Sequence, residues 1–70
     1  MSATYEIRIG GRLSSPAAEL FGDLDVVQHE DWAVVRGDLD QAGLLGVLER
    51  VRALGLELLD ARRVRAAPRA

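Results

Sequence analysis

The pattern of apolar and polar residues along the chain predicts four strands. Tyr5 to Ile9 alternates apolar and charged side chains, which is the period of a half-buried strand. Gly10 and Gly11 then interrupt this alternation. Runs rich in apolar residues predict three further strands, at 24–29, 32–36 and 56–64.

Two segments carry the signals of helices. Residues 14–16 read Ser-Ser-Pro, which favours a helix start because serine caps free amides and proline fits the first helical turn. This short helix is predicted to end at Gly22. Leucine and valine recur at helical spacing over 44–54, and Gly55 is predicted to end this second, longer helix.

The order of elements is therefore β-α-β-β-α-β, which predicts an α+β, ferredoxin-like fold. In this fold a four-stranded antiparallel sheet carries both helices on one face. We predict a single domain over 1–65 and a flexible tail over 66–70.

The string Gly-Asp-Leu-Asp occurs twice, at 22–25 and 37–40. The first copy leaves a helix and enters a strand, whereas the second leaves a strand and enters a helix, so they form no structural repeat. We expect Gly37 to end its strand. Asp38 with Gln41 resembles a capping box, and Asp40 is the other candidate for the helix cap.

The connection between the second and third strands sets their register. If Glu30 and Asp31 form a two-residue turn, the numbers of paired residues sum to 61. The face turned away from the helices then carries these residues, which we predict as a homodimer interface: Val27, His29, Trp32, Val34 and Arg36. A longer turn would slip the register by one residue and direct the tryptophan inward, and this alternative stays open.

The same register sets Asp23 opposite Asp38, near the arginines that end the last strand, Arg62, Arg63 and Arg65. Calcium takes six to eight oxygen ligands, usually from one tight loop, and no such loop motif occurs. We therefore predict no metal site here and expect helix capping with surface ion pairs instead.

The size of the chain favours association. Seventy residues bury too little surface for a large core, and proteins of this size usually depend on disulfides, a metal or a partner subunit. The chain has no cysteine, which excludes disulfides and zinc-thiolate sites. It has a single histidine. We therefore predict a homodimer.

Net charge and hydropathy give expectations about location and partners. The net charge is −2, with −5 over residues 1–40 and +3 over 41–70. No signal peptide and no membrane-spanning apolar stretch are recognised, so we expect a cytoplasmic protein with no membrane partner. Nucleic acid is not expected as a partner, because the third strand lacks the stacking aromatics of RNA-binding domains with this topology.

Few residues offer chemistry. His29 beside Glu30 and Asp31 is expected to be a solvated turn histidine, so no catalytic, cofactor-binding or metal-binding residue is predicted. Gly10-Gly11-Arg12 is a weak candidate for anion or ligand binding, since no phosphate-loop motif accompanies it. Gly43 and Gly46 suggest either close backbone approach or a small cleft along the second helix.

Several stretches resemble a group of short, uncharacterised actinobacterial proteins with a ferredoxin-like pattern. The resemblance spans residues 5–64 and rests on these segments: 5–9, 11–13, 20–24, 40–42, 45–48 and 54–56. That group implies no activity. Its pattern has a tryptophan in the first helix and a histidine in the second, where this chain has Leu20-Phe21 and Leu45.

Together these features predict a non-enzymatic, dimeric module that acts through protein–protein contacts. The alternative is a small-molecule sensing module similar to ACT domains, which share the topology and bind amino acids between subunits. The third hypothesis is a small dimeric ferredoxin-like enzyme, which would need a deeper pocket.

Overall fold

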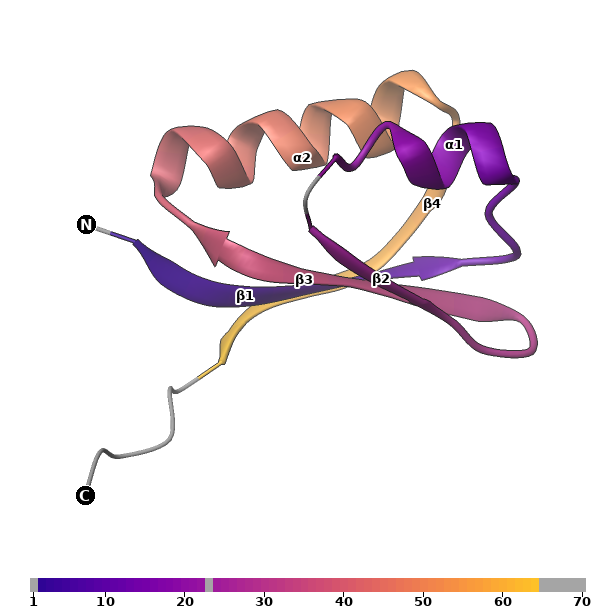
Figure 1. Ribbon diagram of the computed structural model, residues 1–70, viewed down its shortest axis with the longest axis horizontal. Coiled ribbons are helices and arrows are strands. Elements are labelled where there is room, and N and C mark those ends of the chain that lie inside the picture. Colours follow the sequence, from indigo (N-terminus) through magenta and orange to yellow (C-terminus); the bar gives the residue numbers. More distant parts are fainter. Residues whose placement is uncertain (1, 23, 65–70) are drawn as a thin grey trace.

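The computed structural model describes residues 2–22 and 24–64. Its elements follow the order predicted from the sequence: β1 (Ala3–Gly10), α1 (Ser15–Glu19), β2 (Asp25–Gln28), β3 (Trp32–Leu39), α2 (Gln41–Ala53) and β4 (Glu57–Val64). Both helices lie on the same side of the sheet (Figure 1). The predicted tail at 66–70 falls outside the described residues.

The sheet has the order β2-β3-β1-β4, and every neighbouring pair is antiparallel. β1 and β3 are therefore central, and β2 and β4 form the edges. This arrangement confirms the predicted α+β, ferredoxin-like fold.

The core lies between the sheet and the helices. Its fully buried members come from β1, β3, α2 and the segment after α1, and they are Ile7, Ile9, Phe21, Ala33, Val35, Val47 and Val51. Among the described residues, no polar or charged residue is buried with them. The strand residues of this set alternate in sequence, so their neighbours must face the opposite side of the sheet.

Strand β3 is longer than predicted, because Gly37 does not end it. The strand continues to Leu39, which pairs with Ala3 of β1. A side chain at position 37 would overlap the Leu24 side chain. The absence of a side chain at position 37 leaves room for Leu24, so this glycine contributes to packing within a strand rather than to a turn.

The helix ends confirm the predicted cap at Ser14 and show which of the two candidate aspartates caps α2. The Ser14 hydroxyl accepts from the amide of Ala17 at 3.2 Å, as predicted. Helix α1 ends at Glu19, however, before Gly22. At α2 the cap is Asp40, whose carboxylate accepts from the amide of Gly43 at 2.7 Å.

The capping box predicted for Asp38 and Gln41 is wrong. Asp38 lies inside β3, where its carboxylate accepts a hydrogen bond from the Thr4 hydroxyl at 2.6 Å. Because the strand continues to Leu39, Asp38 lies too far before the first helical residue to cap α2. The predicted glycine at the end of α2 is confirmed, since Gly55 follows the helix with φ +70°.

Strand β4 pairs with β1 irregularly. Arg8 lies opposite Asp60 and Ile9 opposite Leu58, so Leu59 is an extra residue, as in a β-bulge. On both sides of this extra residue, the paired residues of β1 and β4 still alternate between the two faces of the sheet.

Within the part of the chain that the structure describes, no helix is long and apolar enough to cross a membrane.

Candidate functional site

The register of β2 and β3 is the predicted one. Asp25 pairs with Arg36, Val26 with Val35, Val27 with Val34 and Gln28 with Ala33. The amide of His29 donates to the carbonyl of Trp32 at 2.7 Å, which closes the two-residue turn. The one-residue slip that would direct Trp32 inward is therefore wrong.

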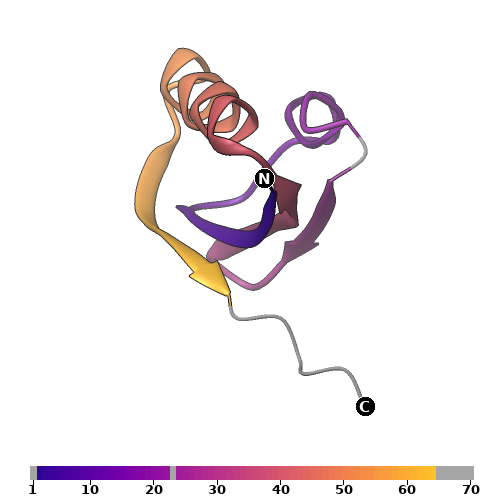
Figure 2. The same cartoon turned by 90° about the vertical axis from the view of Figure 1, so that its left-hand side faces the viewer.

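The helices cover only one face of the sheet, and the end-on view shows the other face without a covering element (Figure 2). We call this second surface the open face. Its described residues alternate with the core residues of each strand and are Thr4, Glu6, Arg8, Asp25, Val27, Trp32, Val34, Arg36, Asp38, Asp60 and Arg62.

The indole of Trp32 is held in place on the open face by two neighbours. The His29 ring stacks on it, with centroids 3.9 Å apart and planes 13° from parallel. The guanidinium of Arg8 lies 4.8 Å from the centroid of the indole, within the range of a cation–π contact. The position of His29 in the turn had suggested a solvated side chain. The side chain is exposed, but its ring also stacks on the indole.

A row of alternating charges crosses the open face from edge to edge. Asp25 of β2 lies opposite Arg36 of β3, which lies opposite Glu6 of β1, which lies opposite Arg62 of β4. Glu6 is the centre of this charged row: its carboxylate lies 3.3 Å from Arg36 and 3.7 Å from Arg62.

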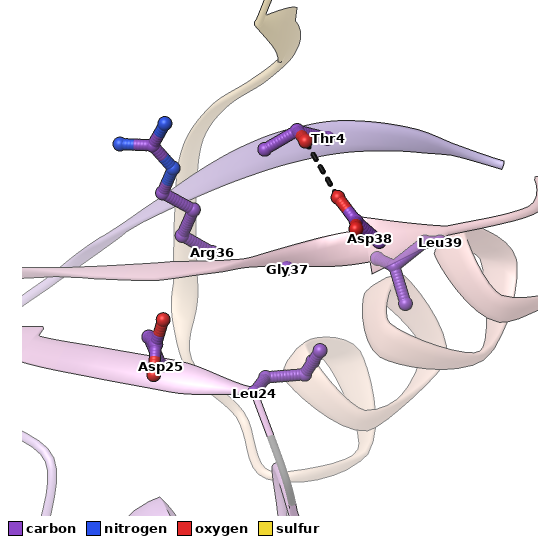
Figure 3. A pocket seen from close by; sticks show the side chains of 7 residues that line it. All are labelled: Thr4, Leu24, Asp25, Arg36, Gly37, Asp38 and Leu39. Atoms are coloured by element: carbon purple, nitrogen blue, oxygen red, sulfur yellow. Dashed lines mark hydrogen bonds between the residues drawn. The ribbon is translucent and has the colours of Figure 1, made fainter. Parts of the chain in front are cut away.

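The two ends of the charged row differ from its centre. The Glu6 side chain is only 20% exposed, whereas that of Arg62 is 66% exposed. The Arg36 side chain extends over β1, away from Asp25 (Figure 3). Among the described residues Asp25 forms no ion pair, so the β2 edge keeps an unneutralised negative charge.

The next row combines valines with a further ion pair. Val27 and Val34 lie side by side, and Val27 is 52% exposed. In the same row, Arg8 lies 3.3 Å from the carboxylate of Asp60. The valines line a shallow hollow of about 500 Å³ next to the charged row. The open face therefore has an apolar corner beside a charged region.

The second Gly-Asp-Leu-Asp copy lines a polar hollow at the end of β3. This open hollow has a volume of about 610 Å³, and the Thr4–Asp38 hydrogen bond crosses one side of it (Figure 3). Asp23 of the first copy, predicted opposite Asp38, lies outside the described residues. Within those residues no cluster of three or more potential metal ligands occurs.

Among the described residues, the arginines of β4 form no ion pair with the repeated aspartates Asp25, Asp38 and Asp40. Arg62 forms its ion pair with Glu6 instead, and Arg65 lies outside the described residues. The reason is the register of β4, which places Arg62 directly opposite Glu6.

The weak anion candidate around Arg12 has a structural use. The guanidinium of Arg12 donates to the carbonyl of Glu30 at 3.0 Å, and the amide of Gly11 donates to the carbonyl of Asp31 at 2.7 Å. Gly11 has φ +86°, a conformation that favours glycine. These contacts join the end of β1 to the hairpin, and anion binding there stays a prediction.

Gln28, which was not among the predicted site residues, fixes the same hairpin. Its Oε1 accepts from the amide of Leu13 at 2.9 Å. Its Nε2 lies within hydrogen-bond distance of three carbonyls, those of Gly11, His29 and Trp32, at 2.8–3.1 Å. The available signal was the polar side chain at a core-facing strand position, opposite Ala33.

An apolar hollow on the helix side was also missed. It has a volume of about 510 Å³ and lies between α2 and β4, where Leu45 is 56% exposed and Leu58 is 46% exposed. The helical spacing of the leucines predicted the helix but did not indicate which of them lie outside the core. Leu45 is turned too far around α2 to reach it.

The glycines of α2 line a third hollow, of about 400 Å³, between α2 and the segment after α1. Gly43 and Gly46 both belong to its lining, as the cleft alternative predicted. Close approach at Gly46 is wrong, since no atom lies within 4 Å of the place that a side chain would occupy. Gly43 instead lies close to the side chains of Leu39 and Asp40.

Comparison with known proteins identifies a family but no activity. A family model described as "Domain of unknown function (DUF8691)" matches residues 4–62, and the chain belongs to this family. No significant match is found among curated proteins or among solved structures.

Proposed function

We propose that this DUF8691 protein is a small dimeric module that acts through protein–protein contacts, and that the open face joins two copies of the chain. The observation that carries the proposal is the arrangement of the open face. Trp32, Val27 and Val34 form an apolar corner beside a charged row that runs across the whole sheet.

The small core supports association. Only seven hydrophobic residues of the described chain are fully buried, and a core of this size supplies roughly 3–5 kcal/mol. Burying apolar surface between two copies adds to this stability, because folding and association then become linked. Neither helix covers the open face (Figure 2).

The charges on the open face permit two copies to approach. Its two central rows carry three arginines and three carboxylates, namely Arg8, Arg36, Arg62, Glu6, Asp25 and Asp60. Equal numbers of opposite charges avoid net repulsion between identical surfaces. The proposed contact has an apolar part and a charged part, as protein interfaces commonly do.

The test compares three exposed apolar residues in sedimentation equilibrium. Val27→Asp places a carboxylate in the proposed contact, and Leu20→Asp places one on a residue of the same exposure, 53% against 52%, outside it. We expect Val27→Asp to raise the dimer dissociation constant at least about a hundredfold, because each dimer then buries two unpaired carboxylates. Leu20→Asp should leave it unchanged.

Leu45→Asp separates the two apolar surfaces. Leu45 lines the hollow between α2 and β4, on the helix side of the molecule. If Leu45→Asp dissociates the dimer while Val27→Asp does not, the contact lies at that hollow and the proposal is wrong. A wild-type chain that is monomeric at all accessible concentrations also contradicts it.

The hollow lined by Gly43 and Gly46 favours amino-acid sensing as the second candidate function. A rise in melting temperature with one free amino acid would support this alternative. The proposal also includes a cytoplasmic location, on the sequence arguments given above, and the actinobacterial resemblance stays a prediction.

A further inference from the structure

The charged row also indicates how two copies would be oriented. We infer that they pair around a twofold axis that runs parallel to the strands and passes between β3 and β1. This inference rests on the proposed function, since it specifies the geometry of the same contact. It identifies the partner as a second copy of this chain.

Such an axis reverses the strand order of one sheet relative to the other. β2 then faces β4 of the second copy, and β3 faces β1 of the second copy. The charged row alternates in sign from one edge to the other, so its reversed image has the opposite sign at every position. The row is therefore complementary to itself.

The contacts across the axis follow from the register. Asp25 faces Arg62 of the second copy, and Arg36 faces Glu6 of the second copy. Symmetry repeats both contacts, which gives four attractive pairs. Asp25 forms no ion pair among the described residues, and Arg62 is 66% exposed, so both are available to a partner.

The row that contains Trp32 brings its aromatic pair towards a carboxylate of the second copy. Trp32 is paired with Gly10 within its own sheet, and Gly10 with Glu57. In the reversed image, Trp32 lies over Gly10 of the second copy, where the side chain of Glu57 covers the glycine. His29, which stacks on Trp32, is brought towards Glu57 of the second copy.

Axes perpendicular to the strands give poorer contacts. If such an axis passes through the charged row, each residue faces its own image, and like charges meet. If it passes between the charged row and the next one, Glu6 faces Arg8 and Arg62 faces Asp60 of the second copy, but Asp25 and Arg36 face Val27 and Val34. Asp25, which forms no ion pair among the described residues, then loses water without gaining a partner, which is unfavourable. Around the inferred axis, Val27 and Val34 face Asp60 and Arg8 of the second copy, and these two charges already pair with each other.

The test exchanges the charges at the two ends of the row. We expect Asp25→Arg alone and Arg62→Asp alone each to raise the dimer dissociation constant at least about tenfold, because each creates two like-charge contacts. The double variant, with both substitutions in one chain, should return the constant to within about threefold of wild type.

Recovery in the double variant would have to come from a contact between chains. Positions 25 and 62 lie on opposite edge strands, β2 and β4, with two strands between them. Three strand spacings amount to roughly 14 Å, too far for a direct ion pair within one chain. The repulsions that the substitutions create within each chain are present in monomer and dimer alike.

Charge changes on α2 provide the matched control. Glu49→Arg and Arg52→Asp alter an exposed ion pair on the helix side by the same charges, so they should leave the dissociation constant unchanged. Single open-face variants that dissociate without recovery in the double variant overturn the inferred axis but retain the open-face contact. A dimer insensitive to Val27→Asp as well overturns the proposed function itself.

Discussion

Replacing Trp32 with aspartate should convert the dimer into a monomer that remains folded. The indole occupies the apolar corner of the open face, where His29 stacks on it and Arg8 lies over it. A central tryptophan in an interface contributes about 2–4 kcal/mol, and a symmetric dimer contains it twice. The expected loss exceeds 4 kcal/mol, or about a thousandfold in the dissociation constant.

Sedimentation equilibrium measures this loss, and far-ultraviolet circular dichroism confirms that the variant keeps its fold. Trp32→Phe is the control, because phenylalanine retains an aromatic ring for the contact with His29 and should preserve most of the dimer. A Trp32→Asp chain that remains folded and dimeric at the wild-type dissociation constant would refute the open face as the interface.

Replacing Phe21 with alanine should remove cooperative unfolding at 25 °C. Phe21 is only 1% exposed and packs with Ile7, Ile9, Val35 and the valines of α2. Truncation of a buried phenylalanine costs about 3–5 kcal/mol, which equals the whole contribution expected from a core of this size. The variant should therefore lack a sharp transition.

Urea titration followed by circular dichroism, at a fixed chain concentration, tests this expectation. The neighbouring residue supplies the control: Leu20 is 53% exposed, so Leu20→Ala should change the free energy of unfolding by less than about 0.5 kcal/mol. A Phe21→Ala chain with a cooperative transition and less than about 1 kcal/mol of lost stability would show that the core lies elsewhere.

Local signals were sufficient to predict the fold and the open face. The order of elements follows from apolar periodicity and from the serine and glycine residues at helix ends. The turn at Glu30 and Asp31 fixes the hairpin register, because a strand repeats every two residues and the turn length sets the pairing. Trp32 was therefore placed on the open face without reference to the rest of the chain.

Features that depend on contacts between distant segments could not be predicted. Gly37 resembles a strand end in the sequence, but the strand continues to Leu39, and Leu24 packs where a side chain at position 37 would be. That continuation makes Asp40 rather than Asp38 the helix cap. The choice between two nearby aspartates is decided by packing across the sheet, which the local sequence does not contain.

The charged row shows the same limit at the candidate site. Asp25 and Arg36 were paired correctly from the hairpin. The pairing of Glu6 with Arg62 depends on how β4 joins β1, and this register shifts between Arg8 and Ile9 because of the extra residue in β4. A bulge of this kind leaves no local mark in the sequence.

Isotope-filtered nuclear Overhauser measurements on an equal mixture of labelled and unlabelled chains test the pairing of two open faces most directly. They detect only contacts between different chains. The predicted result is a set of cross-chain contacts from the Trp32 indole and the methyl groups of Val27 and Val34. Cross-chain contacts confined to Leu45 and its neighbours on the helix side, or none at all, would contradict the account.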